Sequence, residues 1–240
     1  MKAEERHKLK QNEFALAVAR ATESLGANRD RILLAIGGVI VLVVALSAYS
    51  WWSGRTAGQA DAALSVAMEI YDAPIVPAPT VPGAVQQAGT YPSETARTEA
   101  ALAAFQKVVD QYGSTTAGIA ARYHHSSLLM AVGRFADAEK GFQTTIEAAG
   151  STLFASTAKL GKAEAMIGAG NVDGGLKLME ELAAERDGAL PLDGVLMQLA
   201  RSYQRTGKAA EAKTTFKRVV DEFPDSLFAP QARTELAKLG

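Results

Sequence analysis

The sequence contains no cysteine, only three histidines and no excess of either charge. The absence of cysteine excludes disulfide bonds, thiolate metal sites, iron–sulfur clusters and cysteine nucleophiles. Lys and Arg number 25 against 26 Asp and Glu, so the chain lacks the concentrated basic charge that favours nucleic acid as a partner. Hydrophobic residues make up 48% of the 240 positions, which is ordinary for a folded chain of one or two domains.

One long stretch, residues 32–52, lacks any charged residue. A helix over these 21 residues spans about 30 Å, the thickness of the hydrocarbon core of a bilayer. We therefore expect a transmembrane helix here. Arginines precede the stretch, and aromatic rings, which favour the headgroup layer, end it. The expected membrane-interface residues are Arg29, Arg31, Tyr49, Trp51 and Trp52.

The distribution of Lys and Arg predicts the orientation of this helix. Residues 1–31 carry seven basic residues, whereas the twenty residues after Trp52 carry one, Arg55. By the positive-inside rule, the N-terminus stays in the cytoplasm and the C-terminal part lies outside. The alternative is a signal peptide cleaved near Ala45 and Ser47, but the apolar stretch exceeds the usual signal-peptide core of about 7–15 residues.

The segment 1–31 begins with charges and continues with a helical pattern. Phe14, Val18, Ala21 and Leu25 recur at the spacing of one helix face. Two interpretations remain open. The segment is either an amphipathic cytoplasmic helix lying on the membrane or on a neighbouring protein, or a partly ordered tail.

The remaining residues, 53–240, repeat themselves with a period of 37 residues. Columns at this step keep glycine, small residues or large apolar residues, which is typical of stacked helical units. The columns are Gly133, Gly170 and Gly207; Ser126, Ala163 and Ala200; Leu129, Met166 and Tyr203; Ala138, Gly175 and Ala212; and Phe105, Phe142, Met179 and Phe216. Each unit is expected to hold two helices joined by a glycine turn, such as 193–206 and 209–222 in the last unit.

This pattern resembles the tetratricopeptide repeat, a two-helix unit with small, aromatic and proline columns. In the last unit the matching residues are Leu196, Leu199, Ala200, Tyr203, Gly207, Ala212, Phe216 and Pro224. The middle unit departs from the family, because Gly175 and Met179 stand where the family prefers alanine and an aromatic residue. The resemblance implies an all-α fold, with one N-terminal transmembrane helix followed by an α-solenoid of three to four tetratricopeptide-like helix pairs.

The two ends of the array are irregular. A first pair is expected from helices at about 58–71 and 93–112, separated by an insertion at 73–92. Five of the eight prolines fall in this insertion, which precludes a regular helix there. At the other end, residues 228–239 are expected to form a capping helix.

No motif in the sequence predicts catalysis or cofactor binding. Gly168, Gly170 and Gly174 nearly match a dinucleotide fingerprint, but a helix rather than a strand precedes them. His124 and His125 are adjacent, so on a helix they point about 100° apart and cannot easily bind one metal ion. We therefore expect no enzyme, no catalytic or metal site, no cofactor and no small-molecule substrate.

The resemblance implies a partner-binding groove lined by the first helix of each unit. The groove positions of the family fall on Tyr123, Ser127, Met130, Thr157, Leu160, Glu164, Ile167, Met197, Arg201, Gln204 and Arg205. These residues are mixed and partly apolar, so they suit a helix or an extended segment of another protein. The carboxylate clamp of some family members is absent, because its Lys and Asn positions hold other residues here.

Two functions remain open. The first is a structural accessory subunit, anchored by one helix, that holds partner subunits of a respiratory, photosynthetic or secretory membrane complex. The second is a client-binding module, because the layout resembles the YfgM-like ancillary translocon subunits, which implies association with a secretion channel. That resemblance implies a single-pass protein of the bacterial inner membrane with periplasmic repeats. Its partners would be lipid and other proteins, not nucleic acid.

Overall fold

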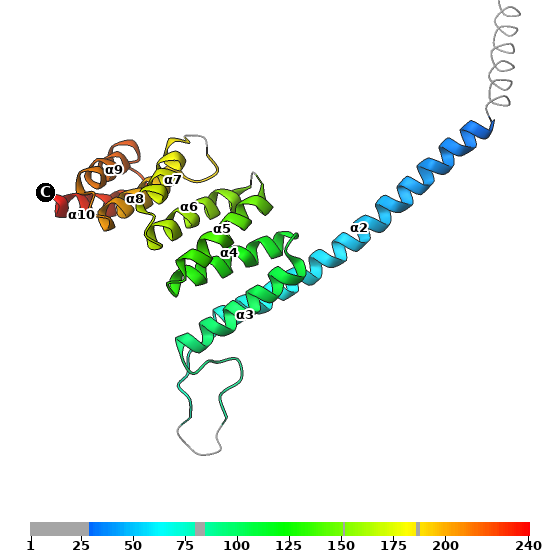
Figure 1. The fold of residues 1–240 in the computed structure, drawn as a ribbon, viewed down its shortest axis with the longest axis horizontal. Coiled ribbons are helices and arrows are strands. Elements are labelled where there is room, and N and C mark those ends of the chain that lie inside the picture. Colours follow the sequence, from blue (N-terminus) through cyan, green and yellow to red (C-terminus); the bar gives the residue numbers. More distant parts are fainter. Residues whose placement is uncertain (1–28, 80–84, 151, 186–187) are drawn as a thin grey trace, which may run out of the picture. The chain divides into compact units, whose positions relative to one another are not determined.

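The computed structural model describes residues 29–79, 85–150, 152–185 and 188–240 (Figure 1). All regular elements in these ranges are helices, as the sequence predicts, and one isolated β-bridge accompanies them. The helices are α2 (Arg29–Tyr71), α3 (Glu94–Tyr112), α4 (Thr116–Ala131), α5 (Phe135–Ala149), α6 (Leu153–Gly168), α7 (Val172–Ala184), α8 (Leu192–Arg205), α9 (Ala209–Glu222) and α10 (Ala229–Leu239). The helix expected around residues 14–25 lies outside the described residues. The chain forms two compact units, Met1–Arg55 and Thr56–Gly240.

Helix α2 is continuous over 43 residues, whereas the sequence predicts separate helices at 32–52 and 58–71. No proline falls between these ranges, and Gly54 and Gly58 each weaken a helix by only about 1 kcal/mol relative to alanine. Because no residue between these ranges breaks the helix strongly, α2 continues to Tyr71. From Ile36 onward α2 is long and apolar enough to cross a membrane, and none of its 18 most apolar consecutive residues is buried. Such a helix fits a membrane anchor or a signal sequence.

The unit Thr56–Gly240 consists of helix pairs that follow one another in chain order (Figure 1). Residues 56–71 of α2 pack against α3, where Ala67 and Phe105 share one buried cluster. The pairs α4–α5, α6–α7 and α8–α9 follow, and α10 packs on α9 as the capping helix. The predicted ranges 93–112, 193–206, 209–222 and 228–239 agree with the observed helices to within one residue at each end. The predicted solenoid of helix pairs is therefore confirmed, with α10 after the last pair and with the end of α2 in place of a separate first helix.

A glycine with a left-handed backbone turns the chain within three of these pairs. Gly133, Gly170 and Gly207 have φ angles of 80°, 96° and 79°, which glycine adopts without a Cβ penalty. In each turn the next amide donates to a carbonyl five residues earlier, as from Lys208 N to Tyr203 O at 2.9 Å. This Schellman arrangement satisfies carbonyls at the helix end and explains why glycine recurs at the repeat period.

The large column of the repeat forms the core between helices. Its members Phe105, Phe142, Met179 and Phe216 are each at most 1% exposed. The small column lies where two helices approach closely: a Cβ added at Gly175 would lie 2.5 Å from the backbone oxygen of Ala163. The close approach of α6 and α7 therefore requires glycine where the repeat family prefers alanine.

The insertion 73–92 is closed at its base by backbone hydrogen bonds. Ile75 and Tyr91 form the β-bridge, in which Val76 N donates to Tyr91 O at 2.9 Å and Tyr91 N donates to Pro74 O at 3.0 Å. The Gln86 side chain adds a hydrogen bond to Val76 O at 2.9 Å. The described residues of the insertion contain no helix, as the prolines predict.

Candidate functional site

A cavity of about 610 Å³ lies beside the C-terminal ends of α4, α6 and α8, the first helices of three consecutive pairs. We call it the first groove cavity. It is lined by five of the predicted groove residues: Ser127, Met130, Glu164, Ile167 and Arg205. The first residues of α5 and α7, Phe135 and Val172, add to its apolar wall. The predicted groove positions do not include these two residues, although their spacing of one repeat period could identify them.

A second groove cavity of about 420 Å³ lies between α6, α8 and the segment that precedes α8. Its lining is mostly apolar: Leu160, Leu190, Pro191, Gly194, Val195, Met197 and Phe228. Gln198 and Arg201 form its polar edge. The structure thus distributes the predicted groove residues over two cavities instead of one continuous groove. Met197 is only 1% exposed, so it belongs to the floor of this cavity and to the core.

A row of hydrogen-bonded polar side chains stands at the border of the two cavities. Gln198 Nε2 of α8 donates to Glu164 Oε1 of α6 at 2.8 Å. Arg201 donates to Gln198 Oε1 at 3.1 Å and to Gln231 Oε1 of α10 at 2.7 Å. Burial raises the pKa of Glu164, while the charges of Arg205 and Arg201 act in the opposite direction. We call Glu164, Gln198 and Arg201 the polar border.

Three predicted groove residues line neither cavity. The Tyr123 ring packs edge-on against Phe142 with 5.7 Å between the ring centroids, and burial raises the pKa of Tyr123. Gln204 Nε2 donates to Glu235 Oε2 of the capping helix at 3.1 Å. The Thr157 hydroxyl donates to the backbone of its own helix at 2.8 Å. The structure therefore places these residues in contacts within the solenoid.

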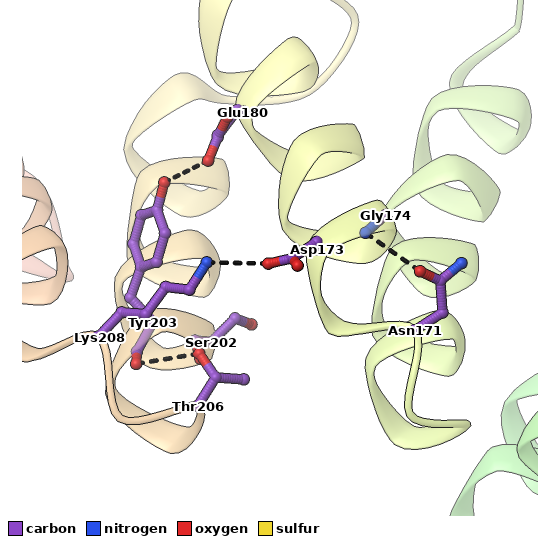
Figure 2. A network of polar contacts seen from close by, with 8 residues as sticks. All are labelled: Asn171, Asp173, Gly174, Glu180, Ser202, Tyr203, Thr206 and Lys208. Carbon is purple, nitrogen blue, oxygen red and sulfur yellow. Dashed lines mark hydrogen bonds and ion pairs between the residues drawn. The ribbon is translucent and has the colours of Figure 1, made fainter.

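A second polar network joins α7 to the pair that follows it (Figure 2). Tyr203 Oη donates to Glu180 Oε1 at 2.6 Å, and Lys208 Nζ pairs with Asp173 Oδ1 at 3.1 Å. Burial first, and then the hydrogen bond to Glu180, raises the pKa of Tyr203. These contacts connect neighbouring helix pairs. Sequence reasoning missed them because the partners are 23 and 35 positions apart and belong to no common column.

The expected membrane-interface residues belong to α2, in the unit Met1–Arg55. Tyr49, Trp51 and Trp52 are 66%, 68% and 60% exposed, and the rings of Tyr49 and Trp52 lie 6.4 Å apart. Aromatic rings exposed near the end of an apolar stretch are typical of a membrane interface. Arg29 and Arg31 lie in the first turn of α2, and their side chains fall outside what the structure describes.

The two adjacent histidines are both half-buried in the structure. The His124 ring stacks on Phe105 with 5.5 Å between centroids. Burial lowers the pKa of both His124 and His125, which favours their neutral forms. Within the described ranges, no three His, Asp or Glu side chains are grouped closely enough to hold a metal ion.

Comparison with known proteins identifies the type of repeat. Residues 195–226, which include most of α8 and all of α9, match the tetratricopeptide repeat family. Two solved structures from Podosopora anserina, described as nearly identical TPR-like repeats, have a similar fold. Their TM-scores are 0.51 and 0.52 at 18% and 17% identity, over 61% of this chain and 78% and 79% of theirs. No curated protein matches the chain.

These findings agree with the helix pairs, glycine turns and buried columns described above. The chain contains a tetratricopeptide repeat within a solenoid of tetratricopeptide-like fold. Repeats of this kind are typically non-catalytic modules, and the fold indicates a scaffold for protein–protein interaction.

Proposed function

We propose that this protein is a non-catalytic scaffold that binds partner proteins through the two groove cavities. The observation that carries the proposal is the first groove cavity, where predicted groove residues from three consecutive helix pairs converge. Its lining combines apolar side chains with the charged groups of Glu164 and Arg205. Such a mixture suits a segment of another protein better than it suits a small apolar ligand.

The proposal includes a single membrane crossing by residues 32–52 of α2. An apolar helix surface with no buried residue in its most apolar part needs lipid or a partner to cover it. The excess of Lys and Arg before this stretch supports an N-terminus in the cytoplasm and repeats on the outer side. For a bacterial inner membrane, the repeats would then lie in the periplasm.

Within this proposal the protein acts as an accessory structural subunit of a larger membrane complex. Such a subunit needs a large and lasting contact. Beyond the groove cavities, the insertion offers exposed apolar side chains on a segment that is held at its base, with Ile75 and Val85 at 43% and 87% exposure. The alternative is a client-binding module of the YfgM-like type, which the open and partly apolar lining of both cavities favours.

The first test is purification of the full chain from its native membranes in mild detergent. A structural subunit co-purifies with a fixed set of proteins in constant proportions, whereas a client-binding module recovers a heterogeneous set in small amounts. Failure to recover any protein beyond the background of an untagged strain would contradict both forms of the proposal.

A variant of the insertion sharpens this test. A short glycine linker in place of residues 77–89 keeps the bridge between Ile75 and Tyr91, so the shorter loop still closes. We expect normal melting of the repeats and reduced recovery of the partners. The control is Lys217→Ala on α9, because Lys217 lines neither groove cavity. Full recovery by the loop variant would exclude the insertion as a partner contact.

Topology is tested by a reporter enzyme that is active only outside the cytoplasm. Fusion after Gly240 should give an active reporter, and fusion before Met1 should give an inactive one. The reverse pattern would contradict the proposed orientation.

A further inference from the structure

The two groove cavities are spaced along α6 in a way that restricts the shape of an occupant. Leu160 lines the second cavity, Glu164 stands at the polar border and Ile167 lines the first cavity. These residues are four and three positions apart on one helix. At about 1.5 Å of rise per residue, Leu160 and Ile167 are therefore about 10.5 Å apart along the helix axis. Arg201 and Arg205 on α8 divide between the two cavities in the same order.

An extended segment does not match this spacing. Successive side chains of a strand alternate between faces, so side chains on one face recur at about 6.6 Å and about 13 Å. A helical segment does match, because its residues i and i+7 lie on one face about 10.5 Å apart. Its residue i+3 or i+4 then faces the polar border between the two cavities.

The charges around the polar border specify the residue at that middle position. The guanidinium of Arg201 donates to the neutral acceptors Gln198 and Gln231, and Arg205 Nη2 donates to the Ser202 hydroxyl at 3.2 Å. In the described part of the chain, neither arginine forms an ion pair with a carboxylate. Glu164 is the acidic residue in the lining of the two cavities, and it already accepts from Gln198. The charges of Arg201 and Arg205 already act on Glu164. The two cations therefore face one carboxylate, and the lining keeps one excess positive charge with which a carboxylate from an occupant can pair.

We propose that the groove binds an amphipathic helix of a partner protein with two apolar residues seven positions apart and an acidic residue midway between them. The apolar side chains enter the two groove cavities, and the carboxylate pairs with Arg201 and Arg205. This inference rests on the proposed function and specifies the chemistry of the partner segment.

The experiment selects from a displayed library of helical peptides of about 15 residues, roughly four turns. Four surface positions at i, i+3, i+4 and i+7 are randomised, and the target is the full chain in detergent micelles. We expect enrichment of Leu, Ile, Met or Phe at i and i+7 and of Asp or Glu at i+3 or i+4. Selection without this pattern, or without enrichment, overturns the proposal.

Charge reversal provides the matched comparison. The double variant Arg201→Glu with Arg205→Glu should change the selected middle residue from acidic to basic. It should also weaken the best acidic peptide at least about tenfold, measured by fluorescence anisotropy. If the double variant melts abnormally, the single variant Arg205→Glu replaces it in both measurements. Arg205 is exposed, so this substitution leaves the core intact. Arg218→Glu on α9 is the control and should leave both the preference and the affinity unchanged.

The outcomes separate this inference from the proposed function. Recovery of stoichiometric partners from membranes together with an unselective peptide library contradicts the inference and leaves the scaffold function standing. Absence of any recovered partner contradicts the scaffold function itself. An acidic preference that survives charge reversal of both arginines also overturns the inference.

Discussion

Replacing Phe142 by alanine tests whether the repeat register positions the core. The ring is 1% exposed and lies against the bare backbone of α6, because a Cβ added at Gly161 would come within 2.7 Å of its carbon atoms. Transfer of the ring to water costs about 2 kcal/mol. A residual cavity of roughly 100 Å³ adds about 2.4 kcal/mol at about 24 cal/mol per Å³. We therefore expect a loss of about 3–5 kcal/mol in the free energy of unfolding.

The assay is urea unfolding of a fragment of residues 56–240, which forms one compact unit, followed by far-UV circular dichroism. Because domains are stable by only about 5–15 kcal/mol, the shift of the midpoint is large at an unchanged m-value. Phe216→Ala should behave in the same way, since Phe216 is fully buried in the same column. Phe154→Ala is the control, because Phe154 is only partly buried and belongs to no column. Equal midpoints for Phe142→Ala and Phe154→Ala would refute the reasoning.

Three further predictions concern the same fragment. Gly175→Ala should destabilise it by about 1–3 kcal/mol through overpacking in urea unfolding, although alanine is the better helix former. Gly194→Ala, whose added Cβ meets the nearest ring at 3.5 Å, should be neutral or stabilising; equal effects would contradict the close approach. Tyr203→Phe removes the hydrogen bond to Glu180 and should cost about 1 kcal/mol in the same measurement, so no loss would argue against this contact. Burial lowers the pKa of His124, so the unfolded state binds more protons and the free energy of unfolding should fall as pH drops below about 6.5. His124→Phe, which keeps the ring stack, should reduce that fall in melts between pH 7 and about 5, and an unchanged slope would contradict it.

The regular features of the solenoid are those that the sequence predicts. The helix pairs, the glycine turns and the column of large buried residues each depend on residue types that recur at the repeat period. A single sequence therefore reveals them by its self-similarity. The sequence does not predict the continuity of α2, because its apolar stretch and the helical pattern that follows are expected as separate elements, although no helix breaker lies between them. The closed base of the insertion depends on backbone hydrogen bonds between Val76 and Tyr91, for which side-chain types give no signal.

The candidate site was predicted only in part. The repeat positions fall on the first helices of the pairs, and Ser127, Met130, Glu164, Ile167 and Arg205 line one cavity; that a partner binds there stays a prediction. Burial within the groove was not predictable, because it depends on how the segment before α8 and the capping helix cover neighbouring residues. In the capping helix, Gln231 accepts a hydrogen bond from Arg201 and Glu235 accepts one from Gln204. No column of the repeat indicates these two contacts.

The most direct test of partner binding by the groove is site-specific photo-crosslinking in intact cells. A photo-reactive amino acid is placed in the full chain at Met130 or Ile167, which line the first groove cavity, and at Lys217 on α9 as the control. The proposed function predicts discrete protein adducts from Met130 and Ile167 and none of the same mass from Lys217. Absence of adducts at both groove positions, or an identical pattern from Lys217, would contradict the claim that the helix pairs bind partner proteins through this groove.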